Sequence, residues 1–106
     1  MCIWCRCDVD TPLVRATTEH LIPRIKGGPS WLENEAAACA RCNGARGHST
    51  LTEWATQCRQ RGWDPDLKRL VMILESLKAR ILRDGGQRRA RPYLDSQLRR
   101  LRNMVD

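Results

Sequence analysis

Cys39-Ala40-Arg41-Cys42-Asn43 is the stretch that decides the fold, together with Cys2-Ile3-Trp4-Cys5 near the start of the chain. In both stretches two residues separate the cysteines, a spacing that lets a tight turn present both sulfurs to one tetrahedral ion. Four soft thiolates suit Zn2+, and a site closed by four protein ligands is structural. We therefore predict that a structural Zn2+ stabilises a small core through Cys2, Cys5, Cys39 and Cys42.

Two disulfides or an iron–sulfur cluster are the alternatives for these cysteines. Met1–Cys5 lacks the apolar core of a secretory signal, so we expect a cytoplasmic protein, and a reducing compartment disfavours disulfides. No stretch approaches the length of a membrane span, and we expect no membrane partner. The remaining Cys7 and Cys58 are expected to be free thiols, with Cys58 packed on a helix beside Trp54.

The chain has 106 residues and 19 Lys and Arg against 12 Asp and Glu, for a net charge of +7. This length is about one domain, so a catalytic site must share one modest core with the rest of the fold. The front half up to Cys58 is neutral, and the whole basic excess lies from Arg59 onward. Clustered cations favour a polyanionic partner such as nucleic acid, and a solvated surface is the alternative.

Helical patterns begin after the cysteine-rich front half. Thr50 and Glu53 have the spacing of a capping box, which predicts a helix over 51–61 that ends at Gly62. Asp64 before Pro65 predicts the cap of a second helix over 65–83. Its apolar seam consists of Leu67, Leu70, Leu74, Leu77 and Ile81.

A last helix over 92–104 is predicted to begin at Pro92, after a stop at Asp84-Gly85-Gly86 and a basic linker over 88–91. Its apolar seam consists of Leu94, Leu98, Leu101 and Val105, and the two seams predict a helical hairpin. Val71, Met72 and Ile73 widen the face of the longer helix, which favours packing on the front half or on a second subunit. We treat 1–50 as the chemical core and 51–106 as a helical extension of the same structural unit.

The segment between the cysteine pairs contains Glu19-His20-Leu21-Ile22-Pro23, then Gly27-Gly28, then Asn34, and Asn43 follows the second pair. With the cysteines, this order resembles the HNH endonuclease family, in which an acid and His precede an apolar-Pro segment and Gly-Gly, followed by Asn and by Cys-x-x-Cys with His or Asn. The resemblance covers roughly Cys2 to His48. It implies an α+β fold with a small zinc-stapled ββα-metal core, also called a His-Me finger, before the basic helical extension.

The resemblance also implies the roles of the site residues. His20 would be the general base, Glu19 and Asn43 would hold one catalytic Mg2+ or Mn2+, and Asn34 would orient the strand or the base. Phosphodiester hydrolysis requires such residues whatever the family, since it needs a base that activates water. Imidazole can be that base, because its ordinary pKa of about 6.5 lets it accept a proton from water. Carboxylate and amide oxygens suit a hard divalent cation. A shared site for Glu19 and His20 requires a bulge or a strand end, because neighbours on a strand point to opposite faces.

Basic residues are the expected contacts to phosphate groups. Four flank the expected site, and a second group follows in the helical part, where a solvated helix face is the alternative. We expect weak sequence preference and binding that weakens steeply with salt. The expected contacts are Arg24, Lys26, Arg41 and Arg46 beside the site and Arg88, Arg89, Arg91, Arg99, Arg100 and Arg102 beyond it.

The leading hypothesis is therefore a metal-dependent endonuclease that acts on DNA, with RNA as an alternative substrate. A non-catalytic, zinc-stabilised protein that binds nucleic acid is the second hypothesis. Homodimerisation through the helical extension is expected if that extension does not pack on the core. Small freestanding proteins of this kind resemble nucleases of phages, mobile elements or restriction systems, so phage packaging or related machinery is an expected partner.

Overall fold

The structure, a computed structural model, describes residues 1–9 and 11–105. Its two strands and its helices confirm the predicted α+β fold. The strands are β1 (Ala16–His20) and β2 (Glu35–Cys39), and short 3-10 turns η1 (Arg24–Lys26) and η2 (Leu32–Asn34) lie between them. The helices are α1 (Ala40–Arg46), α2 (Leu51–Gln60), α3 (Leu67–Asp84) and α4 (Ala90–Met104).

The two strands form an antiparallel ladder without a bulge. Ala16 pairs with Cys39 at one end and His20 pairs with Glu35 at the other. The connection between the strands is long and carries η1 and η2, so residues on this connection lie beside the His20 end of the sheet. The cysteine pair of β2 and α1 lies at the opposite end, which separates the expected zinc site from the expected catalytic end.

Helix α1 follows β2 without a loop, because Cys39 both ends the strand and caps the helix. Its Sγ accepts a hydrogen bond from the Cys42 backbone N–H at 3.4 Å. The N-terminal loop joins the same region, since the Ile3 N–H donates to the Ala37 carbonyl of β2 at 3.0 Å. These contacts bring the first cysteine pair beside the second.

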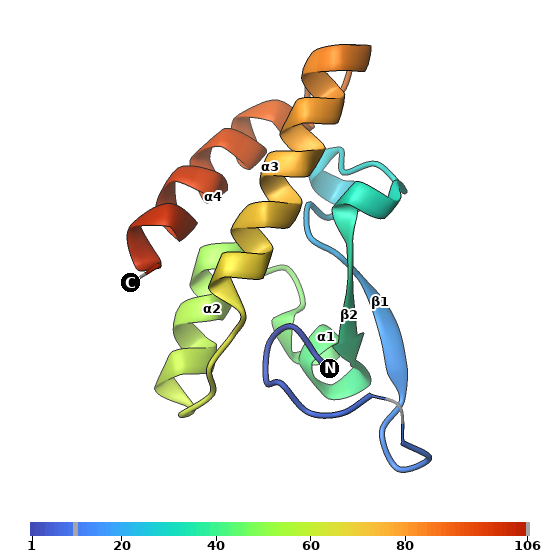
Figure 1. The fold of residues 1–106 in the computed structure, drawn as a ribbon, viewed down its shortest axis with the longest axis vertical. Coiled ribbons are helices and arrows are strands. Elements are labelled where there is room, and N and C mark those ends of the chain that lie inside the picture. Colours follow the sequence, from blue (N-terminus) through green and yellow to red (C-terminus); the bar gives the residue numbers. More distant parts are fainter. Residues whose placement is uncertain (10, 106) are drawn as a thin grey trace.

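Helices α3 and α4 run antiparallel beside each other and pack on α2 and on the η2 end of the sheet (Figure 1). Their apolar seams are buried as predicted, and one core cluster contains residues from both halves of the chain. In this core Trp54 of α2 makes edge-to-face contacts with Trp4 and Trp63. The N-terminal loop and the helical part are therefore packed together.

Two predicted helix starts need correction. Helix α3 begins at Leu67 with Asp66 as its cap, and the Asp66 carboxylate accepts from the Arg69 N–H at 3.2 Å. Asp64 is not the cap because its carbonyl accepts from Arg6 at 2.8 Å, and the Asp66 N–H donates to the Ile3 carbonyl. These tertiary contacts hold 64–66 outside the helix.

The start of α4 lies at Ala90, two residues before Pro92. The Ala90 and Arg91 N–H groups both donate to the Gln87 carbonyl, so the chain turns helical within the basic segment that was predicted to be a linker. Pro92 then occupies the first turn, where its missing N–H costs no intrahelical hydrogen bond. For α2 the Thr50 cap is confirmed, and its hydroxyl accepts from the Glu53 N–H.

The wide face of α3 is only partly covered. Val71 and Ile73 pack against the core, whereas the Met72 side chain is 68% exposed. Helix α3 also contacts η2 of the front half of the chain. Among residues 1–9 and 11–105, no helix is both long and apolar enough to cross a lipid bilayer.

Candidate active site

The four predicted cysteines come together at the end of the sheet where Ala16 pairs with Cys39. The ligand atoms of Cys2, Cys5, Cys39 and Cys42 all lie within 4.8 Å of one another, and the Cys5 and Cys39 sulfurs are 3.9 Å apart. A tetrahedral Zn2+ with bonds of about 2.3 Å places its sulfur ligands roughly 3.8 Å apart. The cluster therefore fits a zinc staple, with three of the four residues buried.

The other two cysteines lie outside this group of four. The carbonyl of Cys7 accepts from the Cys2 N–H, so its backbone shapes the zinc loop. Cys58 is fully buried in α2 beside the tryptophan core, as predicted. Burial raises the pKa of the Cys58 thiol to about 11, partly opposed by the charge of Arg61, so the group is an inert core thiol at neutral pH.

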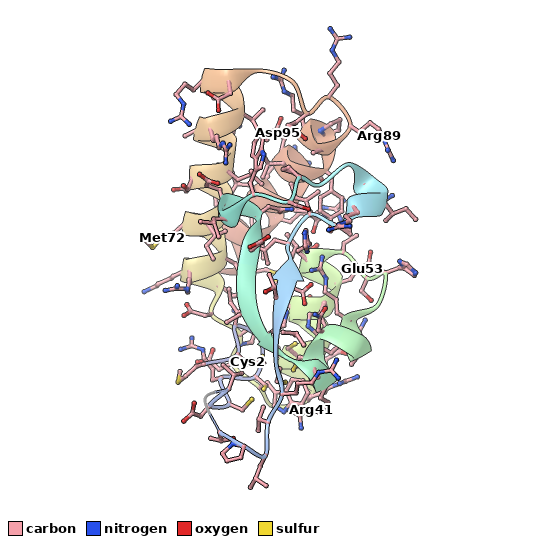
Figure 2. All side chains as sticks on the ribbon, turned by 90° about the vertical axis from the view of Figure 1, so that its right-hand side faces the viewer. Cys2, Arg41, Glu53, Met72, Arg89 and Asp95 are labelled. Carbon is pink, nitrogen blue, oxygen red and sulfur yellow. The ribbon has the colours of Figure 1, made fainter. Side chains whose placement is uncertain are left out.

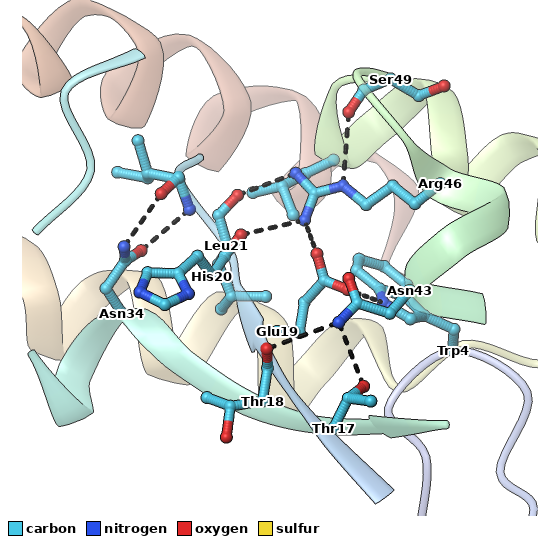
Figure 3. A network of polar contacts seen from close by, with 12 residues as sticks. Trp4, Thr17, Thr18, Glu19, His20, Leu21, Asn34, Asn43, Arg46 and Ser49 are labelled. Atoms are coloured by element: carbon cyan, nitrogen blue, oxygen red, sulfur yellow. Dashed lines mark hydrogen bonds and ion pairs between the residues drawn. The ribbon is translucent and has the colours of Figure 1, made fainter. Parts of the chain in front are cut away.

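One side of β1 faces α1, and polar side chains on the strand contact polar side chains on the helix. Thr17 and Glu19 are two residues apart on the strand, and Asn43 and Arg46 are three apart on the helix, so both pairs lie on facing surfaces. Asn43 Nδ2 donates to Thr17 Oγ1 at 3.1 Å, and Arg46 forms an ion pair with Glu19 (Figure 3). The Asn43 oxygen takes no hydrogen bond from the residues that the structure describes.

The Glu19 carboxylate is buried, with only 3% of the residue exposed. Arg46 binds its Oε1, and Trp4 Nε1 donates to its Oε2 at the long distance of 3.4 Å. Burial raises the pKa of Glu19, and the charge and hydrogen bonds of Arg46 oppose that shift. Glu19 and Asn43 thus bring carboxylate and amide oxygens, the ligand type that hard divalent cations prefer, to one side of β1, where Arg46 and Trp4 already contact the carboxylate.

His20 lies on the other side of the strand, half-buried at its end. Its Nε2 is 3.4 Å from Ser30 Oγ, and Arg24 Nη2 donates to the same hydroxyl at 3.2 Å. Figure 3 shows the His20 ring beside Asn34 and turned away from Glu19. The regular ladder explains this placement, since the bulge that would turn both side chains to one face is absent.

Asn34 is fully buried and closes the connection between the strands. Its Oδ1 accepts from the Ile22 N–H at 2.8 Å, and its Nδ2 donates to the carbonyls of Ile22 and Pro29. Gly28 fits against this loop only without a side chain, because a Cβ would lie 1.8 Å from the Ile22 carbonyl oxygen. Asn34 therefore lies away from solvent and holds the chain that follows His20.

The structure places Arg46 in the interior, which removes it from the expected phosphate contacts. Only 3% of the residue is exposed. Besides Glu19, its guanidinium donates to the carbonyls of His20, Leu21 and Ser49 at 3.2, 2.9 and 3.3 Å. Every edge of the guanidinium is bound, so none remains for DNA.

Arg41 also lies apart from the other expected phosphate contacts. Its guanidinium stacks on Trp63 at 4.6 Å from the ring centroid, and Figure 2 shows it at the zinc end, far from Arg89. Desolvation lowers the pKa of Arg41, but the neighbouring Cys42 and Cys5 outweigh it, so the pKa of Arg41 is raised. Arg41 thus belongs to the surroundings of the zinc staple.

Five of the remaining basic residues gather near His20 from two distant segments, whereas Arg102 of α4 pairs with Glu75 of α3. Arg89 donates to the Ile25 carbonyl at 2.6 Å, which docks the start of α4 on η1. Gly27 allows this close approach, because a Cβ there would lie 2.7 Å from the Arg89 Cβ. The five side chains are exposed, and we call them the η1–α4 surface: Arg24, Lys26, Arg88, Arg89 and Arg91.

Sequence reasoning missed several residues that contact the site. Ser30 bridges His20 and Arg24, Thr17 holds Asn43, and Trp4 contacts Glu19. Tyr93 of α4 accepts hydrogen bonds from Arg46 and from the Leu51 N–H. Period-two spacing of Thr17 and Glu19 could have predicted a polar face of β1, but nothing local to residue 93 marks its long-range contact.

Comparison with known proteins gives one match. The family model for HNH endonucleases matches residues 2–58, more than half of the chain. The match includes the four clustered cysteines, β1, β2, α1 and most of α2, and it stops before α3 and α4. Neither the curated proteins nor the solved structures gave a match. On the family match and the geometry of the site, the chain belongs to the HNH endonuclease family.

Proposed function

We propose that this protein is a metal-dependent endonuclease that hydrolyses DNA phosphodiester bonds on a scaffold stapled by Zn2+. His20 is the general base, and Glu19 and Asn43 hold one Mg2+ or Mn2+. The observation that carries the proposal is the position of His20, half-buried at the end of β1 and directly beside the exposed η1–α4 surface. Arg24 belongs to that surface and shares Ser30 with His20.

In this proposal the phosphate lies across the end of β1, whose outer edge pairs with no other strand of the described chain. His20 then accepts a proton from water on one side of the strand, and Ser30 orients the ring. Glu19 and Asn43 face α1 on the other side. A bound divalent cation would supply charge neutralisation at the phosphate.

The η1–α4 surface supports DNA as the partner. Cations that meet a phosphate backbone release counterions and supply binding that does not depend on base sequence. Within residues 1–9 and 11–105, Lys26, Arg88 and Arg91 form no ion pair with a carboxylate. These three cations are therefore available to phosphate groups. The same surface would serve a binding protein without catalysis, which is the second candidate function.

Replacement of His20 tests the proposal. Plasmid DNA should be nicked by the wild-type protein with Mg2+ or Mn2+ and left intact with a chelator that spares the zinc. His20→Ala should lower the rate by about a hundredfold or more, because a general base contributes roughly 10²- to 10⁴-fold. Zinc content and circular dichroism should stay unchanged.

His48→Ala is the matched control, because His48 is the other histidine of the chain and is exposed in the turn after α1. It should cleave at the wild-type rate. Equal cleavage by His20→Ala would remove His20 as the base, and DNA binding without cleavage under every divalent cation would favour the non-catalytic function.

A further inference from the structure

Arg46 is the most heavily bonded side chain in the described part of the chain near the site, and the proposed chemistry does not use it. Its five hydrogen bonds and its contact with the face of Trp4 reach four separate segments: β1 and the residue after it, the turn after α1, the zinc loop, and α4. A buried guanidinium is costly unless it is paired and hydrogen-bonded, and here both conditions hold. Such a residue fixes the relative position of the segments that it joins.

Two of these contacts hold the backbone on which His20 is mounted. Arg46 Nη1 donates to the His20 carbonyl and Nη2 donates to the Leu21 carbonyl (Figure 3). The His20 carbonyl belongs to the peptide group directly after the His20 Cα, and the Leu21 carbonyl belongs to the next one, so both contacts restrain the backbone that follows His20. Because Glu19 holds the same guanidinium, the end of β1 cannot rotate without breaking a buried ion pair.

The contact with Tyr93 extends this arrangement to α4, which lies outside the family match. The Tyr93 hydroxyl oxygen accepts from Arg46 at 3.5 Å and from the Leu51 N–H at 3.3 Å. Leu51 is the first residue of α2, so one hydroxyl joins the start of α2 to the end of α1. Through this hydroxyl, helix α4 contacts the Arg46 side chain that holds the His20 end of β1.

We propose that Arg46 is a positioning residue for His20, and that Tyr93 couples the C-terminal helix to it. The inference rests on the proposed function of His20 as the base. Arg46 is buried, so its loss should change the rate of the chemical step and leave DNA binding almost unaltered. An arginine that contacted phosphate would have the opposite effect and would mainly weaken binding.

Arg46→Lys tests this role, because lysine keeps the charge beside Glu19 but loses the planar fork that reaches both carbonyls. We expect kcat for cleavage to fall about 10- to 100-fold with KM changed less than twofold, since a small misplacement of a catalytic group has effects of this size. Tyr93→Phe keeps the ring and should lower kcat by a few fold. Arg59→Lys is the matched control, because Arg59 donates to the Met104 carbonyl away from His20.

Imidazole signals in nitrogen-15 spectra give a readout that does not depend on activity. The chain has two histidines, so His48→Ala assigns the His20 signals directly. These signals should shift in Arg46→Lys and stay unchanged in Arg59→Lys. If Arg46→Lys does not fold, Tyr93→Phe supplies both measurements.

The outcomes separate the two proposals. A wild-type protein that cuts no DNA refutes the proposed function, and the imidazole signals alone then decide the role of Arg46. Wild-type cleavage with the same kcat in Arg46→Lys and Arg59→Lys overturns the inference and leaves the function standing. A rise in KM with kcat preserved also overturns it, because that result means direct contact with DNA.

Discussion

Buried polar side chains, rather than exposed ones, hold the His20 end of β1 in place. Asn34 and Arg46 both bind backbone groups of the residues next to His20, from opposite sides. Their hydrogen-bonding groups are satisfied, so each contributes modest net stability, but removal of either leaves a buried partner without a hydrogen bond. The family pattern could predict that position 34 matters, whereas its contacts with Ile22 and Pro29 follow only from the folded loop.

The Asn34 contacts predict a large loss of stability in Asn34→Ala. The Ile22 N–H would lose its buried acceptor, and an unpaired buried donor costs about 1–3 kcal/mol. We expect the free energy of unfolding of the zinc-loaded protein to fall by about 2 kcal/mol, which lowers Tm by roughly 10 °C in a domain of this size. Thermal denaturation followed by circular dichroism measures the change. Asn103→Ala, at an exposed position of α4, is the control, and equal Tm values for the two variants would contradict the assigned role.

At the scale of elements, α1 combines two functions in a short helix. Cys39 caps it, Cys42 belongs to the zinc cluster, and Asn43 and Arg46 face β1. The cysteine spacing could predict the position of this helix because a thiolate pair requires a tight turn there. The burial of Arg46 could not be predicted, since an arginine at the end of a short helix is usually exposed and its partner Glu19 lies 27 positions away.

The helix starts show the same limit of prediction from local sequence. The Thr50 cap was confirmed, with its hydroxyl accepting from the Glu53 N–H, because both partners are local in sequence. The starts of α3 and α4 were wrong by two residues each, because contacts of Arg6 and Ile3 with 64–66 and of Arg89 with η1 determine them. Local signals therefore predicted that a helix exists, and long-range contacts decided where it begins.

Cys39, the cap of α1, and Cys58 of α2 should differ sharply in their effect on zinc content. Cys39→Ala removes a ligand of the four-thiol cluster, so we expect loss of the bound zinc and of near-ultraviolet circular dichroism. Cys58→Ala removes a buried sulfur that no cluster uses and should keep one zinc per chain, at a cost of about 1 kcal/mol. Mass spectrometry of the metal content compares the two. Zinc loss in Cys58→Ala would mean that the cluster is assigned to the wrong cysteines.

At the scale of the whole molecule, the helical part packs against the core that the family model matches. It shares one apolar cluster with the zinc loop, and its Gln97 accepts hydrogen bonds from the Thr52 N–H and hydroxyl. Charge alone could predict a basic second half. The docking of Arg89 on Ile25, which brings that charge beside His20, required the fold, because 64 residues separate the two.

This juxtaposition predicts that the salt dependence of DNA binding comes mainly from the η1–α4 surface. Each phosphate contact contributes about one unit to the slope of log affinity against log salt. The double variant Lys26→Gln/Arg88→Gln should therefore reduce the magnitude of the slope by up to about two, measured by fluorescence anisotropy on a short duplex. Lys68→Gln/Arg69→Gln removes the same charge from exposed positions at the start of α3, remote from η1 in Figure 1, and should leave the slope near the wild-type value. Equal reductions in both variants would mean that DNA responds to the net charge of the molecule and that no localised surface binds it.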